Sequence, residues 1–420
     1  MVKHRQSGAA LLIMLTILVL AAATLFINQL KNVDSTFFQY QRSDDILQEA
    51  RGALIGWALT HVQQPGLLPV PDLRNDGNYD GRSDCPVGAI NNSHLLGRLP
   101  WLAYSAPCLD PRGGTGAHLK DASGESLWYA VSANLLYDFG YPTINSELAD
   151  SSSGWITVRD NSGAVISDRV AALVIAPGVA LPGQNRAGAA PQANRYLDSI
   201  TIGAVTYSNA NFDSDFIRAD ENDSFNDRMA YITIDELMLL VERKVVAKVR
   251  GCLDDYAAAS GDKYPWAAPL NGAAVPSYTG VYNSGFGRLA DTLNIESTPG
   301  VNDPSMQSTW QPAGCLSGLA YWNSWRELVF YQVAPGYQPG SAAACPGCLT
   351  LNGAGSHRSM VMVAGHRLAG QSRSSNSDKG NIANYLEGDN ADADNAFEMQ
   401  AASALFNDRV ICVDGANQCQ

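Results

Sequence analysis

The sequence predicts an α+β fold: one long N-terminal membrane-spanning helix, then two duplicated lobes, each a helix packed on an antiparallel sheet. Three observations predict it. The N-terminus carries a long uncharged run, four segments recur in the same order in both halves, and short Val- and Ile-rich runs lie between turn residues. The length of 420 residues suits two to three domains of ordinary size. We therefore expect one helical spine and two copies of one lobe.

The N-terminal run from Ala9 to Ile27 contains no charged residue. At about 1.5 Å per residue it extends roughly 28 Å, which matches the hydrocarbon core of a bilayer. Lys3 and Arg5 precede it, so the positive-inside rule keeps the N-terminus in the cytoplasm and exports the rest. A cleaved secretory signal and a plain uncleaved anchor are the alternatives. The secretory signal needs a shorter apolar core and an A-x-A-like site, which the residues after Ile27 lack.

Helical spacing of apolar residues continues over residues 31–61, and Pro65 and Gly66 end the predicted helix. A second amphipathic helix opens the second half, where Thr233 and Glu236 form a capping box and Gly261 provides the stop. The predicted divisions are a leader (1–8), the membrane half of the first helix (9–30), a first lobe (31–234) and a second lobe (235–420).

The duplication rests on four pairs of similar segments in the same order. They are 50–61 with 249–260, 171–186 with 359–373, 194–198 with 384–388, and 225–233 with 406–413. The Val- and Ile-rich runs predict short strands. These are 156–160, 171–176, 359–365 and 409–413. A helix packed on an antiparallel sheet would bury the apolar faces of both elements.

The leader MVKHRQSG ends in Gly8 directly before the apolar run. It resembles the class III signal of type IV pilins and pseudopilins, and the resemblance covers roughly residues 1–61. In that family a prepilin peptidase cuts after the glycine, here between Gly8 and Ala9, and methylates the new N-terminus. Most members carry Glu at the fifth mature position, where this chain has Ile13. That departure is typical of minor pilins and pseudopilins at a filament tip.

The resemblance implies a minor pilin or tip-type pseudopilin, a structural, assembly or adhesive subunit of a type IV pilus or type II secretion-like filament with no enzymatic activity. Its implied partners are other subunits, the prepilin peptidase and the inner membrane, with a possible surface ligand or adhesion target. It would be a single-pass inner-membrane precursor and, once assembled, part of a periplasmic or cell-surface filament. The alternatives are a membrane-anchored periplasmic enzyme or thiol redox protein, and an unprocessed inner-membrane scaffold. The net charge of −13 argues against nucleic acid as a partner.

One loop carries oxygen ligands at the spacing that a hard cation requires. The predicted ligands are Asp76, Asn78, Asp80 and Asp84. Alternating oxygens followed by Gly81 for the sharp turn predict a structural calcium site of the extracellular kind. The alternative is an Asn-, Asp- and Gly-rich turn without metal. A second segment, 388–398, holds three further aspartates but lacks the turn glycine.

All eight cysteines follow the predicted anchor, in an oxidising compartment by the orientation argument, so disulfides are the expectation. Pairing between neighbours along the chain is one of several possibilities. It would join Cys85 with Cys108, Cys252 with Cys315, Cys345 with Cys348, and Cys412 with Cys419. The CPGC segment at 345–348 also suggests redox chemistry, but no βαβ pattern surrounds it. A structural clamp is the favoured interpretation, and His357 is the other residue on which the enzyme alternative would depend.

Overall fold

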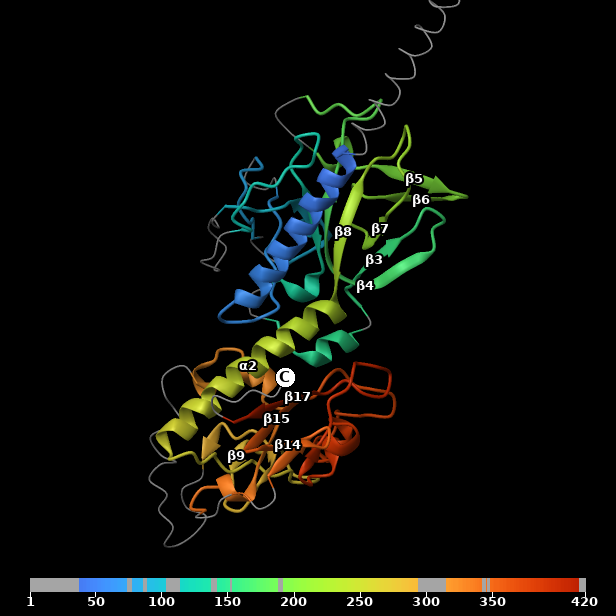
Figure 1. Cartoon of the computed structure of the whole chain (residues 1–420). Coiled ribbons are helices and arrows are strands. Elements are labelled where there is room, and N and C mark those ends of the chain that lie inside the picture. Colours follow the sequence, from blue (N-terminus) through green and yellow to red (C-terminus); the bar gives the residue numbers. More distant parts are fainter. Residues whose placement is uncertain are drawn as a thin grey trace, which may run out of the picture.

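The computed structural model of the chain shows two sheet-containing lobes joined by one long helix, α2 (Figure 1). The structure describes residues 38–73, 78–85, 89–102, 114–136, 142–151, 153–187, 192–293, 315–341, 345 and 348–414. The predicted leader (1–8) and the apolar run from Ala9 to Ile27 lie outside these residues.

In the first lobe a helix over residues 38–60 packs against a six-stranded sheet. Leu47, Ala50 and Leu54 are buried at helical spacing, so one face of this helix forms part of the core. The strand order is β1-β2-β4-β3-β7, and β8 also pairs with β4. The strands are β1 (Leu96–Arg98), β2 (Trp128–Val131), β3 (Ile156–Arg159), β4 (Val165–Ala176), β7 (Asp215–Ile217) and β8 (Arg228–Thr233), with a separate hairpin of β5 (Ser199–Ile202) and β6 (Val205–Ser208). Four short 3-10 helices connect them: η1 (Asn92–His94), η2 (Ala133–Leu135), η3 (Ser146–Asp150) and η4 (Ala193–Arg195).

In the second lobe α2 (Ile234–Ala259) covers a four-stranded sheet with the order β10-β12-β15-β17. Smaller sheets combine β14-β13-β16 and β11-β9. The strands are β9 (Thr279–Gly280), β10 (Phe286–Arg288), β11 (Thr292–Leu293), β12 (Val329–Val333), β13 (Leu349–Leu351), β14 (Ala354–His357), β15 (Ser359–Val363), β16 (Ala396–Phe397) and β17 (Arg409–Val413). The short helices are η5 (Leu316–Gly318), α4 (Trp322–Trp325), η6 (Pro335–Tyr337), α5 (Asn376–Lys379), η7 (Ile382–Asn384) and η8 (Gly388–Ala391).

The two lobes share a common set of strand pairings, to which the first lobe adds the β5–β6 hairpin and the second adds the β9–β11 pair. Arg98 at the end of β1 lies opposite Trp128 of β2, and Arg288 at the end of β10 lies opposite Phe330 of β12. The next strand pairs with the last strand of its lobe, as β4 with β8 and as β15 with β17. A parallel pair completes each lobe, β3 with β7 and β13 with β16. Each lobe is therefore built from the same succession of pairings.

The lobes are joined without a linker. Thr233 is the last residue of β8, and its side chain accepts a hydrogen bond from the backbone N–H of Glu236 as the N-cap of α2. This hydrogen bond is one of the two that the predicted capping box requires. The Glu236 side chain does not make the second bond and instead forms an ion pair with Arg51 of the first helix. One cluster of buried residues runs from the helix over 38–60 through α2 to β12 and β15. This shared core crosses the predicted boundary at 234/235, so the lobes fold against each other.

The predicted fold class is wrong in its membrane-spanning helix. Among the described residues, no helix is both long enough and apolar enough to cross a bilayer. The first described helix, over residues 38–60, exposes charged residues such as Asp45 and Glu49 along its length, so only one of its faces is apolar. The same finding overturns the predicted localisation as a single-pass inner-membrane precursor.

The predicted purely antiparallel sheets are also corrected. Strands predominate in a mixed α/β structure, and three strand pairs are parallel: β3–β7, β9–β11 and β13–β16. A parallel neighbour requires a long connection between the two strands. The connection from β3 to β7 contains β4, β5 and β6, and the connection from β13 to β16 contains β14 and β15.

Candidate functional site

The structure places the predicted site residues in different regions of the molecule. Gly8, Ala9 and Asp76 lie outside the described residues. Of the other predicted calcium ligands, Asp84 is 5% exposed and accepts a hydrogen bond from the backbone N–H of Leu73 at 2.7 Å. Asp80 accepts one from the backbone N–H of Arg82 at 2.9 Å and forms an ion pair with its guanidinium at 3.4 Å. Arg82 thus supplies Asp80 with the positive charge that a cation would bring.

A fourth carboxylate, which the sequence analysis did not single out, closes this loop. Asp72 accepts a hydrogen bond from the backbone N–H of Gly81 at 2.7 Å and is 2% exposed. Asp72 and Asp84 therefore fasten the loop from opposite ends by binding backbone donors. Asn78 lies in the same loop and is exposed.

The calcium prediction is tested by Asp80→Ala. If calcium occupies the loop, the substitution will lower the melting temperature by several degrees more in calcium than in chelator, since only the bound state loses a metal ligand in addition to the hydrogen bond from Arg82. If the loop is a turn without metal, the loss will be equal in both conditions and will follow from the lost hydrogen bond to Arg82. Thermal unfolding of both chains, with and without a chelator, separates the two results.

Two disulfides join described cysteines, Cys252–Cys315 and Cys345–Cys348. Cys85 and Cys412 are also disulfide-bonded, to partners outside the described residues. No described cysteine is free. The Cys345–Cys348 bond closes a small ring after η6, and Cys345 packs beside the buried cluster of the second lobe. Its placement matches a loop clamp better than a thiol at the start of a helix.

His357 belongs to a polar pair at the end of β14. Its Nδ1 lies 2.6 Å from a carboxylate oxygen of Asp414, whose other oxygen accepts the backbone N–H of Arg358 at 2.7 Å. Cys412 lies close enough for the three residues to surround a metal ion. Because the sulfur of Cys412 is in a disulfide, it is not available as a thiolate ligand. The arrangement serves to tie β14 to the end of β17.

The aspartates of the segment 388–398 lie on a turn-rich surface. Asp392 and Asp394 each accept a hydrogen bond from a backbone N–H two residues further on, so they stabilise tight turns. Asp389 is exposed and donates its own backbone N–H to Glu398 at 3.2 Å. These bonds account for the local carboxylates as turn-forming groups.

The strongest polar constellation is a pair of buried carboxyl groups that occurs once in each lobe. In the first lobe the backbone N–H of Asp198 donates to Asp227 at 2.7 Å, and the backbone N–H of Asp227 donates back to Asp198 at 3.2 Å. The side chain of Gln184 donates to the second oxygen of Asp198 at 2.7 Å, and that of Asn209 donates to Asp227 at 3.0 Å. The two carboxyl groups thereby lock the turn after η4 to the start of β8.

The second lobe repeats this pair with a longer side chain. The backbone N–H of Glu387 donates to Asp408 at 2.8 Å, and the backbone N–H of Asn407 donates to Glu387 at 3.0 Å. The side chain of Gln371 donates to Glu387 at 2.8 Å, and that of Asn390 donates to Asp408 at 3.0 Å. Asn407 corresponds to Asn226, whose backbone N–H donates to Asp198 at 2.7 Å in the first lobe, so the two networks use the same kinds of donor and acceptor, although Asn209 and Asn390 reach the carboxyl groups from different places in the chain.

A buried arginine accompanies each pair. Arg186 donates to the backbone oxygen of Gly178 at 2.7 Å and stacks over the ring of Tyr196. Its counterpart, Arg373, donates to the oxygen of Gly365 at 3.1 Å and has its guanidinium carbon 4.5 Å from the ring centre of Tyr385. Burial lowers the pKa of Arg373, and the negative charge of nearby Glu147 acts in the opposite direction by raising it.

Burial and the charge of the neighbouring carboxylate favour the neutral form of one acid in each lobe. Burial raises the pKa of Asp227 well above its ordinary value, and the charge of Asp198 raises it further. In the second lobe burial raises the pKa of Asp408 well above the usual range, and the charge of Glu387 adds to the effect. Repulsion between two nearby carboxylates disfavours the state in which both are charged. The arrangement fastens loops to strands through backbone N–H groups.

The sequence contained the signal for these networks. Gln, Arg, Tyr, an acid and Asn-Asp recur in the same order in three of the four repeated segment pairs. Identical polar residues at equal positions of two copies also indicate a shared buried network, because buried polar groups require partners.

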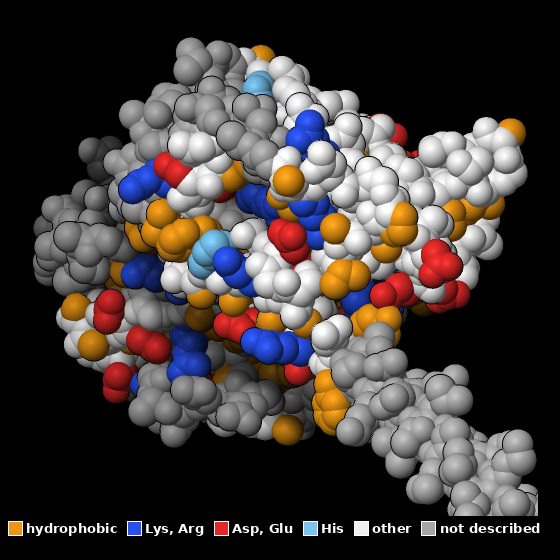
Figure 2. All heavy atoms as spheres, turned by 90° about the horizontal axis from the view of Figure 1, so that it is seen from above, with side chains coloured by type: hydrophobic (Ala, Val, Ile, Leu, Met, Phe, Trp, Pro, Cys, Tyr) orange, Lys and Arg blue, Asp and Glu red, His pale blue; other side chains and the backbone are white. Residues whose placement is uncertain are grey.

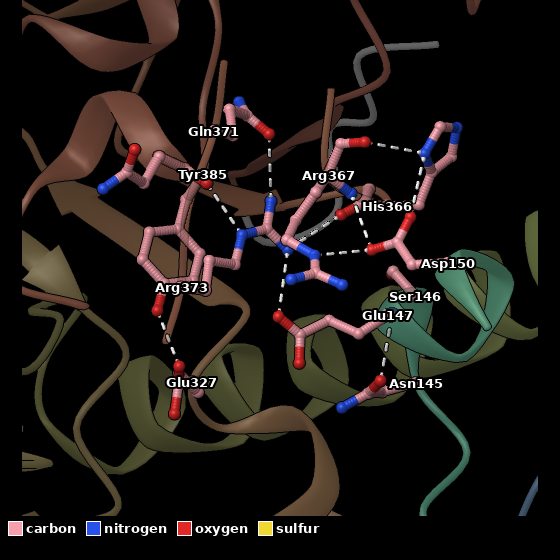
Figure 3. Close-up of polar contacts among 12 residues, drawn as sticks. Asn145, Ser146, Glu147, Asp150, Glu327, His366, Arg367, Gln371, Arg373 and Tyr385 are labelled. Carbon is pink, nitrogen blue, oxygen red and sulfur yellow. Dashed lines mark hydrogen bonds and ion pairs between the residues drawn. The ribbon is translucent and has the colours of Figure 1, made fainter. Parts of the chain in front are cut away.

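The lobes are held together by a second polar group of residues, around η3 (Figure 3). Asp150 accepts hydrogen bonds from Arg367 through the backbone N–H at 3.1 Å and through Nε at 2.9 Å, and Nδ1 of His366 lies 3.4 Å away. Burial tends to raise the pKa of Asp150, but the bonds from His366 and Arg367 outweigh it and lower the pKa. The bond to Asp150 raises the pKa of His366.

Neighbouring residues of η3 extend this contact. Glu147 lies 3.6 Å from the guanidinium of Arg373, so the network of the second lobe reaches the first lobe directly. Ser146 donates to Glu242 of α2 at 2.8 Å, and Glu242 lies 3.5 Å from Arg409. Ser146, Glu242 and Arg409 line a cavity of about 390 Å³ between η3, the first turns of α2 and the start of β17.

Comparison of the chain with protein-family models, with curated proteins and with solved structures found no significant match.

Proposed function

We propose that this chain is a structural subunit of a filament, of the minor pilin or tip-type pseudopilin kind, with an assembly or adhesive role. The observation that carries the proposal is the repeated lobe: a helix on a sheet, twice in one chain, around one shared core. A subunit that binds other filament subunits needs rigid lobes with exposed helix faces. A core shared by the two lobes provides that rigidity.

The polar networks support a structural role. In both lobes the buried carboxyl groups accept backbone N–H groups and fasten loops to strands. The contact at η3 joins the lobes through charged groups that pair with one another. On the described part of the face in Figure 2, basic and acidic side chains are interspersed, which suits contact with proteins better than contact with nucleic acid.

The leader provides the test of this proposal. When the chain is produced together with a prepilin peptidase, its intact mass should fall by the mass of residues 1–8 and rise by one methyl group on Ala9. Gly8→Val is the matched control, because it removes the residue after which the cut is expected. An unchanged mass in the presence of an active peptidase would contradict the proposal.

A further inference from the structure

The helix over residues 38–60 and α2 occupy equivalent places in their lobes. The repeated segments 50–61 and 249–260 align the two helices residue by residue. Their buried positions coincide, since Leu47 corresponds to Val246 and Leu54 to Leu253, and all four are almost fully buried. The two helices therefore expose equivalent stripes to solvent.

These stripes carry opposite charges at the same positions. Asp45 and Glu49 are exposed one turn apart on the first helix, and the corresponding residues on α2 are Lys244 and Lys248, also exposed. None of the four forms an ion pair with any residue that the structure describes. Two carboxylates and two ammonium groups at matched spacing form complementary surfaces on one chain.

Both stripes continue into positions where backbones can approach closely. Gly52 on the first helix and Gly251 on α2 occupy equivalent positions, and a Cβ at either would have no atom within 4 Å. Glycine at an exposed helix position costs about 1 kcal/mol relative to alanine. Its presence next to the charged pairs suits a helix that packs closely against another helix.

A groove adjoins the basic stripe. It has a volume of about 710 Å³ and lies between the end of the first helix, α2 and the residues after η5. Lys244 and Lys248 line it together with Val62, Leu319 and Tyr321. Val62 is 79% exposed, so an apolar side chain is available for contact beside the two ammonium groups.

We propose that this face binds a second copy of the chain, whose helix over 38–60 places Asp45 and Glu49 against Lys244 and Lys248. The two stripes differ, so the contact is head to tail and leaves one free stripe at each end of the pair. The inference rests on the proposed function as a filament subunit and names its partner as an identical chain. The overall charge of −13 opposes self-association, and the local complementary charges overcome it at this face.

The experiment is a charge swap in the full chain, with self-association measured by sedimentation at low ionic strength. Lys244→Glu with Lys248→Glu, or Asp45→Lys with Glu49→Lys, should weaken self-association about tenfold, because each makes both stripes alike in sign. The chain with all four substitutions should associate like the unaltered chain. Equimolar mixing of the two double variants should also restore association. Raising the salt to about 0.5 M should weaken the contact in the unaltered chain.

Lys120→Glu with Asp223→Lys is the matched control, since both residues are exposed and neither belongs to either helix. It should leave association unchanged. An unaltered chain that stays monomeric at low ionic strength, or a four-fold variant that fails to recover, would overturn the interface. If the double variants still enter filaments, the proposed interface is wrong, but the proposed function as a filament subunit is retained. If the unaltered chain is never found in filaments, the proposed function itself fails.

Discussion

Replacing Cys252 and Cys315 together by alanine is expected to lower the free energy of unfolding by about 4 kcal/mol. The disulfide joins α2 to the start of η5 across a sequence separation of 63 residues, and breaking it releases a large loop in the unfolded chain. Both cysteines are buried, at 2% and 6% exposure, so alanine also loses some packing. Chemical denaturation of the two chains measures the difference.

The matched comparison is the second disulfide. Replacing Cys345 and Cys348 by alanine opens a ring with a separation of only 3 residues, so the expected loss is about 2 kcal/mol. If both pairs cost the same, loop entropy is not the source of the stabilisation. If loss of the Cys345–Cys348 bond leaves stability unchanged but abolishes a disulfide-exchange activity, the bond is a redox group and the proposed structural role is wrong.

Local sequence signals predicted the parts of the fold that depend on neighbours in the chain. The Val- and Ile-rich runs became β3, β15 and β17 at nearly the expected positions, whereas β4 begins at Val165, six residues before the predicted run. Thr233 caps α2 as its place before an apolar-periodic segment predicted. Both features depend on hydrogen bonds and side-chain periodicity within a few residues, which the order of residues specifies directly.

The tertiary contacts could not be predicted from the sequence, for a physical reason. The core shared by the lobes depends on where α2 packs, and amphipathic spacing identifies a buried face without its partner. Asp84 has the spacing of a calcium ligand, yet folding brings it to the backbone of Leu73. Carboxylates accept backbone N–H groups and bind cations with the same oxygens, so ligand spacing alone does not separate the two roles.

The contact at η3 could also not be predicted from sequence patterns. Asp150 and Arg367 are 217 residues apart, and neither belongs to a recognisable motif. His366 occupies the position of Val179 in the first lobe, so the duplication itself indicates that the fold needs no imidazole there. The bond of His366 to Asp150 belongs to the joint between lobes, a role that the second copy acquired and the first copy lacks.

Asp408→Asn is expected to raise stability at alkaline pH and to change it little near pH 4. Burial and the charge of Glu387 raise the pKa of Asp408, so the stability contributed by the protonated acid is complete below the ordinary pKa of 3.8 and is lost as pH rises through the raised value. Asparagine stays neutral at every pH, while its oxygen still accepts from Glu387 and its amide donates in place of the proton. The expected gain is roughly 1–3 kcal/mol at pH 8.

Asp378→Asn provides the opposite control, because hydrogen bonds from the backbone and hydroxyl groups of Ser375, Ser372 and Ser374 lower the pKa of this exposed acid. Its stabilising contribution is present above the ordinary pKa and is lost as pH falls, so asparagine should destabilise at neutral pH and less so in acid. Thermal unfolding of both variants from pH 2 to 8 should therefore give differences from the unaltered chain with opposite slopes: the difference for Asp408→Asn changes above the ordinary pKa, and that for Asp378→Asn changes below it. A flat difference for Asp408→Asn would mean that the pair holds no proton in the folded state. Asp227→Asn should repeat the slope of Asp408→Asn, because the first lobe contains the same pair of carboxyl groups.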